Sequence, residues 1–217
     1  MLDCKEYSII MVGSAALTAA IEILENRGEE LKKRYSKRYL DEAYARLLEY
    51  RRLQEAAAEA LSPYLETDEE EEAGKKRDTG VRESLKETFQ TFAGDETDSS
   101  PICGHDCSKE RDVPYLICCS LDGVFGALYR LGDMLKTGLR ARLYDIPIDQ
   151  VTIELCDYMD INPYEADTKG AFLIASDSHG RMLKELKEKG IPAKLIGYTA
   201  RDNSRIVLGP TERYLTK

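Results

Sequence analysis

The sequence predicts an α/β (α+β) fold, in which helices pack on a mixed β-sheet. Apolar strand-like runs alternate with helical stripes over 115–217, in the order β-α-β-α-β-α-β-β. One further strand and two helices are expected near the N-terminus, ahead of a long acidic and polar stretch. This order of elements is typical of a sheet with helices packed on it.

The first predicted strand is the apolar run from Tyr7 to Gly13, which the glycine ends. Ser14 is a candidate N-cap for the helix that follows, because a serine oxygen can accept from the first helical amides. That helix has apolar residues three, four and seven apart, and Gly28 is expected to end or bend it. A second helix is expected from its N-cap candidate Ser36 to Tyr64, with an apolar stripe that includes Leu53 or Gln54.

The composition changes abruptly between residues 66 and 112. The stretch opens with the acidic block 68–72 and continues with a basic triplet and with many Gly, Thr, Ser and Asp residues. Few of its residues could bury enough apolar surface to offset the entropy of ordering. We expect an acidic, disordered insertion here.

The second half of the chain alternates regularly between strand-like and helix-like segments. Apolar residues at helical spacing predict helices over 123–136, 148–159 and 178–189. Strands are expected over the ranges Tyr115–Cys119, Leu139–Tyr144, Ala171–Ala175, Lys194–Thr199 and Arg205–Leu208.

Charge and cysteine usage exclude several classes of partner. The net charge of −9 argues against nucleic-acid binding and against an anionic membrane surface. The most apolar stretch, 8–24, is interrupted by Glu22 and is too short for a membrane span, and no signal peptide is evident. Six cysteines, two of them adjacent, suit reduced thiols better than a disulfide framework. We therefore expect a soluble cytoplasmic protein.

Several segments follow one another in a recognisable order. Leu155–Glu165 is a helix with a proline-containing loop, and Lys169–Ala175 is a glycine that leads into an apolar strand. Met182–Ala193 and Leu195–Gly197 are a closing helix and strand, and Asp122–Leu128 is a Gly-rich turn at a helix start. Together with the N-terminal strand and helix, these segments resemble the second domain of the AIR-synthase (PurM)/HypE superfamily. The resemblance thus implies one PurM C-terminal-domain-like unit built from 1–65 and 113–217.

Complete members of this superfamily have two domains, and their first domain supplies most of the ATP and metal site. No segment of this chain resembles that first domain. The resemblance therefore assigns no cofactor to this chain by itself. ATP and Mg²⁺ would bind only together with a partner domain. The partner would be a separate AIR-synthase N-terminal-type subunit or a second copy of this chain in a homo-oligomer.

The Gly-rich turn is the candidate site for a small phosphorylated ligand. A turn that leads into a helix presents unpaired amides and a positive dipole end. The candidate residues are Ser120, Asp122, Gly123 and Val124. Two more come from other segments that resemble the family, Asn162 from Leu155–Glu165 and Gly170 from Lys169–Ala175. Asp122 stands where HypE-type relatives have a glycine, so its carboxylate weakens this prediction. The alternative interpretation is that Asp122 only favours the helix dipole and that Asn162 only fixes a turn.

A second candidate site combines Cys103, His105 and Cys107, which are metal-ligand types. Their Cys-x-His-x-Cys spacing lacks the second matching pair of a structural zinc site, so coincidence is the alternative. His179, at an expected helix start, is interpreted as a surface residue. Asp157 and Asp160 are interpreted as solvated carboxylates.

Three functions follow from these patterns. The first is an accessory or regulatory binding protein, similar to a hydrogenase-maturation factor, that has lost autonomous catalysis. The second is half of a split ATP-dependent maturation enzyme or ligase, completed by a separate subunit. The third is a metal- or redox-responsive interaction module built on the Cys/His group.

Overall fold

A computed structural model describes residues 6–61, 115–120, 122–188 and 191–216. These residues form a mixed sheet of seven strands in the order β2-β4-β1-β5-β3-β6-β7. Neighbouring strands are antiparallel except for β3 and β6, which run parallel. The strands are β1 (Ser8–Val12), β2 (Tyr115–Cys118), β3 (Gly138–Arg142), β4 (Phe172–Ser176), β5 (Ala193–Ala200), β6 (Arg205–Leu208) and β7 (Glu212–Tyr214).

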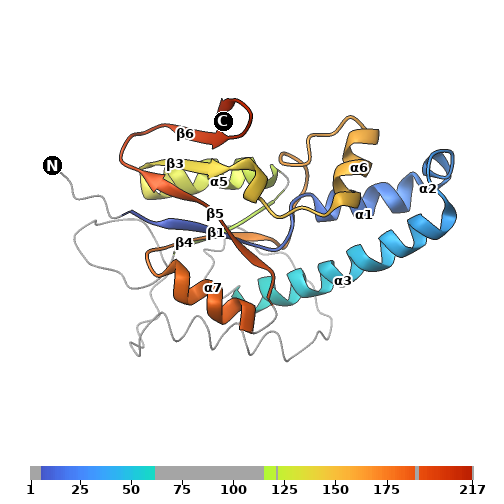
Figure 1. Cartoon of the computed structure of the whole chain (residues 1–217), viewed down its shortest axis with the longest axis horizontal. Helices are drawn as coiled ribbons and strands as arrows, with labels where there is room; N and C mark the ends of the chain where they lie inside the picture. The colour runs from blue at the N-terminus through green and yellow to red at the C-terminus, as the bar shows by residue number, and fades with distance from the viewer. Residues whose placement is uncertain (1–5, 62–114, 121, 189–190, 217) are drawn as a thin grey trace.

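The helices form layers on the two faces of this sheet and a group beside it (Figure 1). Helix α5 packs on one face, α7 packs on the other, and α1, α2, α3 and α6 form a helical group with its own core. The helices are α1 (Leu17–Asn26), α2 (Gly28–Leu31), α3 (Lys37–Leu61), α5 (Gly123–Leu135), α6 (Gln150–Tyr158) and α7 (His179–Glu188), with the 3₁₀ turn η2 (Leu143–Asp145).

The central strand β1 shows why both faces of the sheet are buried. Its side chains alternate between the faces, so Ile9 and Met11 join the core under α5. Ile10 and Val12 join the core under α7 instead. All four are at most 1% exposed, which explains why the sequence here is continuously apolar rather than alternating.

The α/β prediction is confirmed, and the expected strands and helices are found within a few residues of their predicted bounds. One local prediction needs correction. Ser14 is not an N-cap, because α1 begins at Leu17 and follows Ala16, which has a left-handed φ of 52°. The first helix was expected to end or bend at Gly28, and it ends at Asn26, with Gly28 at the start of the separate helix α2. Strand β7 was not predicted at all, because its residues are exposed and carry no apolar pattern.

The expected insertion over 66–112 lies outside the described residues, as does the end of the second predicted helix beyond Leu61. Residues 6–61 and the described residues from 115 onward share one sheet, because β1 pairs with β4 and β5. In that same part of the chain, none of the helices has both the length and the apolar character of a membrane span.

Candidate functional site

The predicted phosphate turn lies between β2 and α5 and is held closed by backbone contacts. The carbonyl of Ser120 accepts from the amides of Gly123, at 2.9 Å, and of Thr168, at 3.2 Å. Gly123 has a φ of +65°, and a Cβ there would lie 2.5 Å from the carbonyl oxygen of Tyr164. Only glycine therefore fits this position without a shift of the backbone.

The loop that contains Asn162 packs against the start of α5. The amide of Phe125 donates to the carbonyl of Tyr164 at 3.1 Å, and the two rings stack with centroids 5.3 Å apart. The Asn162 side chain accepts from the amide of Tyr164 at 3.2 Å, which fixes the turn of this loop. A protein carbonyl thus occupies one of the helix-terminal amides on which a phosphate would depend.

An ion pair also covers the turn. Arg130 donates to the carboxylate of Asp122 and, at 2.9 Å, to the carbonyl of Cys118. Ser120 donates to the same carboxylate at 2.8 Å. Desolvation alone would raise the pKa of Asp122, but the hydrogen bonds from Arg130 and Ser120 outweigh it and lower the pKa below its ordinary value. The side chain of Asp122 makes no capping bond to α5.

The structure therefore brings together Ser120, Asp122, Gly123 and Val124 with the Asn162 loop, as the sequence predicted for one site. Gly170 has a φ of +89°, and a Cβ on it would lie 3.4 Å from Cγ of Gln54, while its backbone hydrogen-bonds the Cys118 thiol of β2. That this set of residues binds a phosphorylated ligand stays a prediction.

The predicted metal ligands Cys103, His105 and Cys107 lie outside the described residues. Among the residues that are described, no group of three or more His, Cys, Asp or Glu side chains could hold a metal ion. Cys118 and Cys119 are free thiols there, and burial raises the pKa of each. Both thiols are therefore poor nucleophiles at neutral pH.

His179 and Glu165 each have a side-chain partner. Nδ1 of His179, at the start of α7, lies 2.9 Å from the Ser8 hydroxyl of β1. Asp157 and Asp160 lie at the end of α6, where the amide of Asp160 donates to the carbonyl of Asp157. Glu165 pairs with Arg213 at 2.5 Å.

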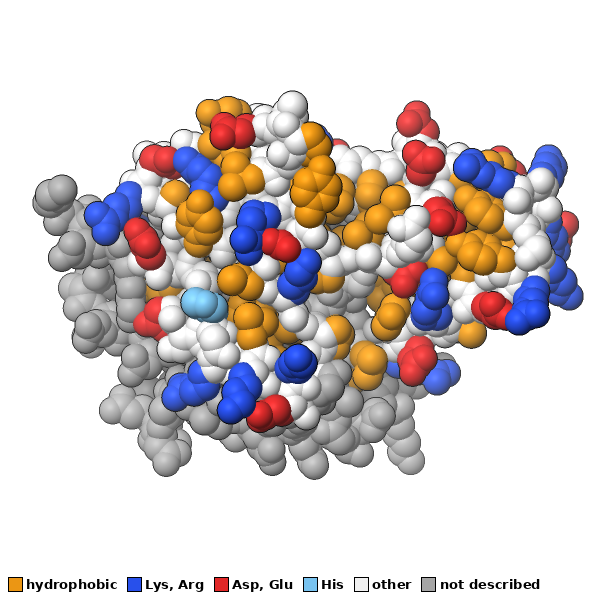
Figure 2. Space-filling model, in the orientation of Figure 1, with side chains coloured by type: hydrophobic (Ala, Val, Ile, Leu, Met, Phe, Trp, Pro, Cys, Tyr) orange, Lys and Arg blue, Asp and Glu red, His pale blue; other side chains and the backbone are white. Residues whose placement is uncertain are grey.

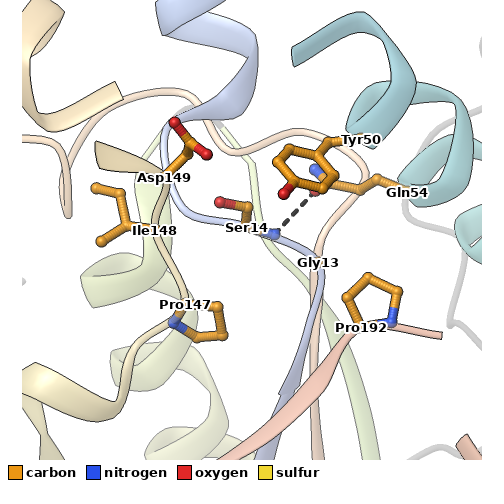
Figure 3. Close-up of a pocket in the computed structure, with 8 residues that line it drawn as sticks. All are labelled: Gly13, Ser14, Tyr50, Gln54, Pro147, Ile148, Asp149 and Pro192. Carbon is orange, nitrogen blue, oxygen red and sulfur yellow. Dashed lines mark hydrogen bonds between the residues drawn. The ribbon is translucent and has the colours of Figure 1, made fainter. Parts of the chain in front are cut away.

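A cavity of about 220 Å³, which the sequence did not reveal, lies beside the turn from β1 to α1. Figure 3 shows this turn between two residues of α3 and the loop that leads into α6. Its lining residues are Gly13, Ser14, Tyr50, Gln54, Pro147, Ile148, Asp149 and Pro192.

Gln54 fixes the wall of this cavity, although it lies in the buried stripe of a helix. Its side-chain oxygen accepts from the Ser14 amide at 3.0 Å, and its side-chain nitrogen donates to the Lys169 carbonyl at 2.9 Å. A Cβ on Gly13 would lie 2.7 Å from that oxygen, so the glycine makes room for the contact. A glutamine within a predicted apolar stripe is the signal in the sequence that could have indicated this contact.

No family model matches this chain, and no curated protein matches it. Solved structures do. HypE from E. coli superposes with a TM-score of 0.57 at 14% identity, over 100% of this chain and 51% of that one. HypE in a HypE–HypF complex gives 0.56 at 12% identity, over 97% and 52% of the two chains. Thiamine-monophosphate kinase from Stenotrophomonas maltophilia K279a gives 0.52 at 13%, over 94% and 50%.

These likenesses confirm a PurM/HypE-related fold, which is the fold that the resemblance in the sequence implied. The chain spans about half the length of each of these proteins. Identities of 12–14% establish the fold only.

Proposed function

We propose that this chain is an accessory or regulatory binding protein with a PurM/HypE-like fold, which does not carry out ATP-dependent chemistry by itself. The observation that carries the proposal is the closed turn between β2 and α5. The Asp122 carboxylate, neutralised by Arg130, stands where an anionic ligand would approach. The Tyr164 carbonyl accepts a hydrogen bond from the Phe125 amide at the same helix start. A phosphate here would have to displace both groups.

A partly uncovered sheet face supports the binding role. Tyr198, Arg140 and Tyr214 share the face opposite α5, because the sheet register places Tyr198 opposite Arg140 and both Arg140 and Tyr214 opposite Ile206. Tyr198 is 50% exposed and Tyr214 is 63% exposed. Figure 2 shows hydrophobic side chains among Lys and Arg side chains over β3, β5 and β6.

This combination of side chains suits a protein partner. Tyr and Arg are enriched at the centres of protein interfaces. The guanidinium of Arg140 is held by Asp202 at 2.6 Å and by the Ser204 carbonyl at 2.8 Å, so little side-chain entropy remains to be lost on binding. We propose that the partner is a second copy of this chain or a separate AIR-synthase N-terminal-type subunit.

The second candidate function is half of a split ATP-dependent enzyme. It is favoured by the likeness to HypE, which has been solved in complex with ATP and in complex with HypF, while this chain spans about half of those chains. In that case ATP turnover would appear only when a separate ATP-binding subunit is added.

Calorimetric titration of the full chain with ATP and Mg²⁺ tests the leading proposal. We expect no saturable heat and no release of phosphate. Saturable micromolar binding with turnover would overturn it. Turnover that requires an added N-terminal-type subunit would instead select the split enzyme.

Sedimentation velocity over a range of concentrations tests the interaction surface. If the partner is a second copy, Tyr198→Ala should lower the fraction of dimer, whereas Tyr144→Ala should not. Tyr144 is a suitable control because it is 73% exposed and lies on η2, outside the row of sheet residues. Equal effects of the two changes would rule out this sheet face as the contact.

A further inference from the structure

The cavity beside the β1–α1 turn has apolar walls on two sides. Pro147 and Ile148 come from the loop before α6, Pro192 comes from the segment before β5, and the ring of Tyr50 comes from α3. These groups suit one face of a flat ligand. The volume of about 220 Å³ is below the range of roughly 300–1,000 Å³ that holds drug-sized molecules, so a single ring is the fitting size.

Hydrogen bonding within the protein uses up the backbone donors of this wall. The amide of Gly13 donates to the Pro192 carbonyl at 3.1 Å, and the amide of Ala15 donates to the Pro147 carbonyl at 2.8 Å. The Ser14 amide donates to Gln54 at 3.0 Å. The turn therefore offers no free amide nest for a phosphate or a carboxylate.

The side chains that remain at the cavity are mainly acceptors. Oδ1 of Asp149 accepts from the Val151 amide at 2.9 Å and from Arg46 at 3.1 Å. Within the described part of the chain, neither its Oδ2 nor the hydroxyls of Ser14 and Tyr50 have a hydrogen-bond partner. The Asp149 side chain is only 13% exposed, so its charge is shielded less by water than a surface carboxylate would be.

We propose that this cavity binds a small, single-ring ligand that carries a cationic or neutral N–H donor group, such as an amidine or an amino-heterocycle. The ring packs against Tyr50 and the two prolines, where a cationic ring also gains from the aromatic face. The donor group bonds to Oδ2 of Asp149 and to the Ser14 hydroxyl. This site is separate from the β2–α5 turn and does not depend on the proposed partner surface.

Arg46 makes the proposal specific. It pairs with Asp149 from outside the cavity and is 48% exposed, so it neutralises part of the charge that a cationic ligand would use. Removing Arg46 should therefore tighten the binding of a cation. A cavity that binds only by apolar contact would not respond in this direction.

Nuclear magnetic resonance titration of the ¹⁵N-labelled full chain tests the proposal, with benzamidine as the probe and benzoate as its matched anion. We expect saturable shifts of the Gly13, Ser14 and Ala15 amides with benzamidine, and none with benzoate. Asp149→Asn retains a residue type that caps a helix equally well but removes the charge. It should weaken benzamidine about tenfold, the loss that corresponds to about 1.4 kcal/mol.

Two further variants complete the test. Arg46→Gln should tighten benzamidine several-fold, and Arg38→Gln, which removes an exposed charge that pairs with Glu42 on α3, should leave its affinity unchanged. The proposal is overturned if benzamidine gives no saturable shift at these amides, if benzoate binds equally well, or if Asp149→Asn has no effect. None of these outcomes bears on whether the chain binds ATP, so the two proposals fail separately.

Discussion

Two of the strand-to-helix turns of this fold show opposite ways to satisfy the same backbone groups. At the β1–α1 turn, four consecutive amides from Gly13 to Ala16 donate to acceptors from four distant segments, and an open cavity remains beside them. At the β2–α5 turn, the chain folds a loop and an ion pair directly over the helix start. A cavity adjoins the first turn, whereas protein groups bond to the helix-start amide and to the carboxylate of the second.

The difference teaches that a glycine in a turn does not by itself indicate a ligand site. Gly123 and Gly13 both have positive φ, yet each is needed for contact with the protein's own atoms. Gly123 allows the Tyr164 carbonyl to approach α5, and Gly13 allows Gln54 to reach the Ser14 amide. What decides the accessibility of each turn is the segment that packs on it.

The largest effect is expected from closing the space at Gly123. In Gly123→Ala, the new Cβ would meet the Tyr164 carbonyl at 2.5 Å while the backbone holds a left-handed φ of +65°. Left-handed strain and the displaced loop should together cost about 2–4 kcal/mol of unfolding free energy. Urea unfolding measures this loss.

Gly180→Ala is the matched control for that change. Gly180 lies in the first turn of α7, and nothing would lie within 4 Å of its Cβ. Alanine should raise the unfolding free energy there by up to about 1 kcal/mol, because it has the higher helix propensity. Equal losses for the two variants would contradict the close packing of the β2–α5 turn.

The next largest effect is expected at the other turn, from Gln54→Leu. Leucine has a similar size but leaves the Ser14 amide and the Lys169 carbonyl without their partner. Buried groups that lose a hydrogen bond cost about 1–3 kcal/mol, so we expect a loss of about 2 kcal/mol in urea unfolding.

Gln150→Ala is the control for the glutamine change. Gln150 donates to Glu154 on the exposed surface of α6, and its loss should change the unfolding free energy by less than about 0.5 kcal/mol. If Gln54→Leu were equally mild, the bridge from α3 to the β1–α1 turn would not be a structural element of the cavity.

The contrast between the turns also marks what the sequence could predict. The buried strands and α5 were predictable because their apolar residues follow a local period of 2 or 3.6. The grouping of the candidate residues at the β2–α5 turn was predictable too, because most of them are nearly consecutive in the sequence. Its closure was not, because Arg130 and Tyr164 come from eight and more than forty positions away.

The N-cap prediction at the β1–α1 turn was wrong for the same physical reason. Ser14 has the residue type of an N-cap, but its amide bonds to Gln54 and the next helix begins three residues later. The Ala16 amide is instead satisfied by Thr168, 152 positions away. Local propensity carries no information on such partners. Strand β7 was missed because a short exposed edge strand has no buried face to produce a pattern.

The smallest and most specific effect is expected from Asp122→Asn at the β2–α5 turn. The pKa of Asp122 is lowered in the folded protein, in spite of desolvation, by its bonds to Arg130 and Ser120. A lowered pKa contributes stability above the unfolded pKa of about 3.9, and this contribution is lost as the pH falls through the folded pKa. The pair is 38% and 46% exposed, so its contribution should be no more than about 1 kcal/mol.

The unfolding free energy of Asp122→Asn should therefore lie below that of the natural chain at pH 7, and the difference should shrink toward zero as the pH falls below about 4. Asparagine changes no cap here, because the Asp122 side chain makes no capping bond to α5. A double-mutant cycle with Arg130→Gln isolates the pair, and its coupling should vanish over the same pH range. A difference that is independent of pH would mean that the ion pair does not close this turn, and the turn would again be a candidate for binding phosphate.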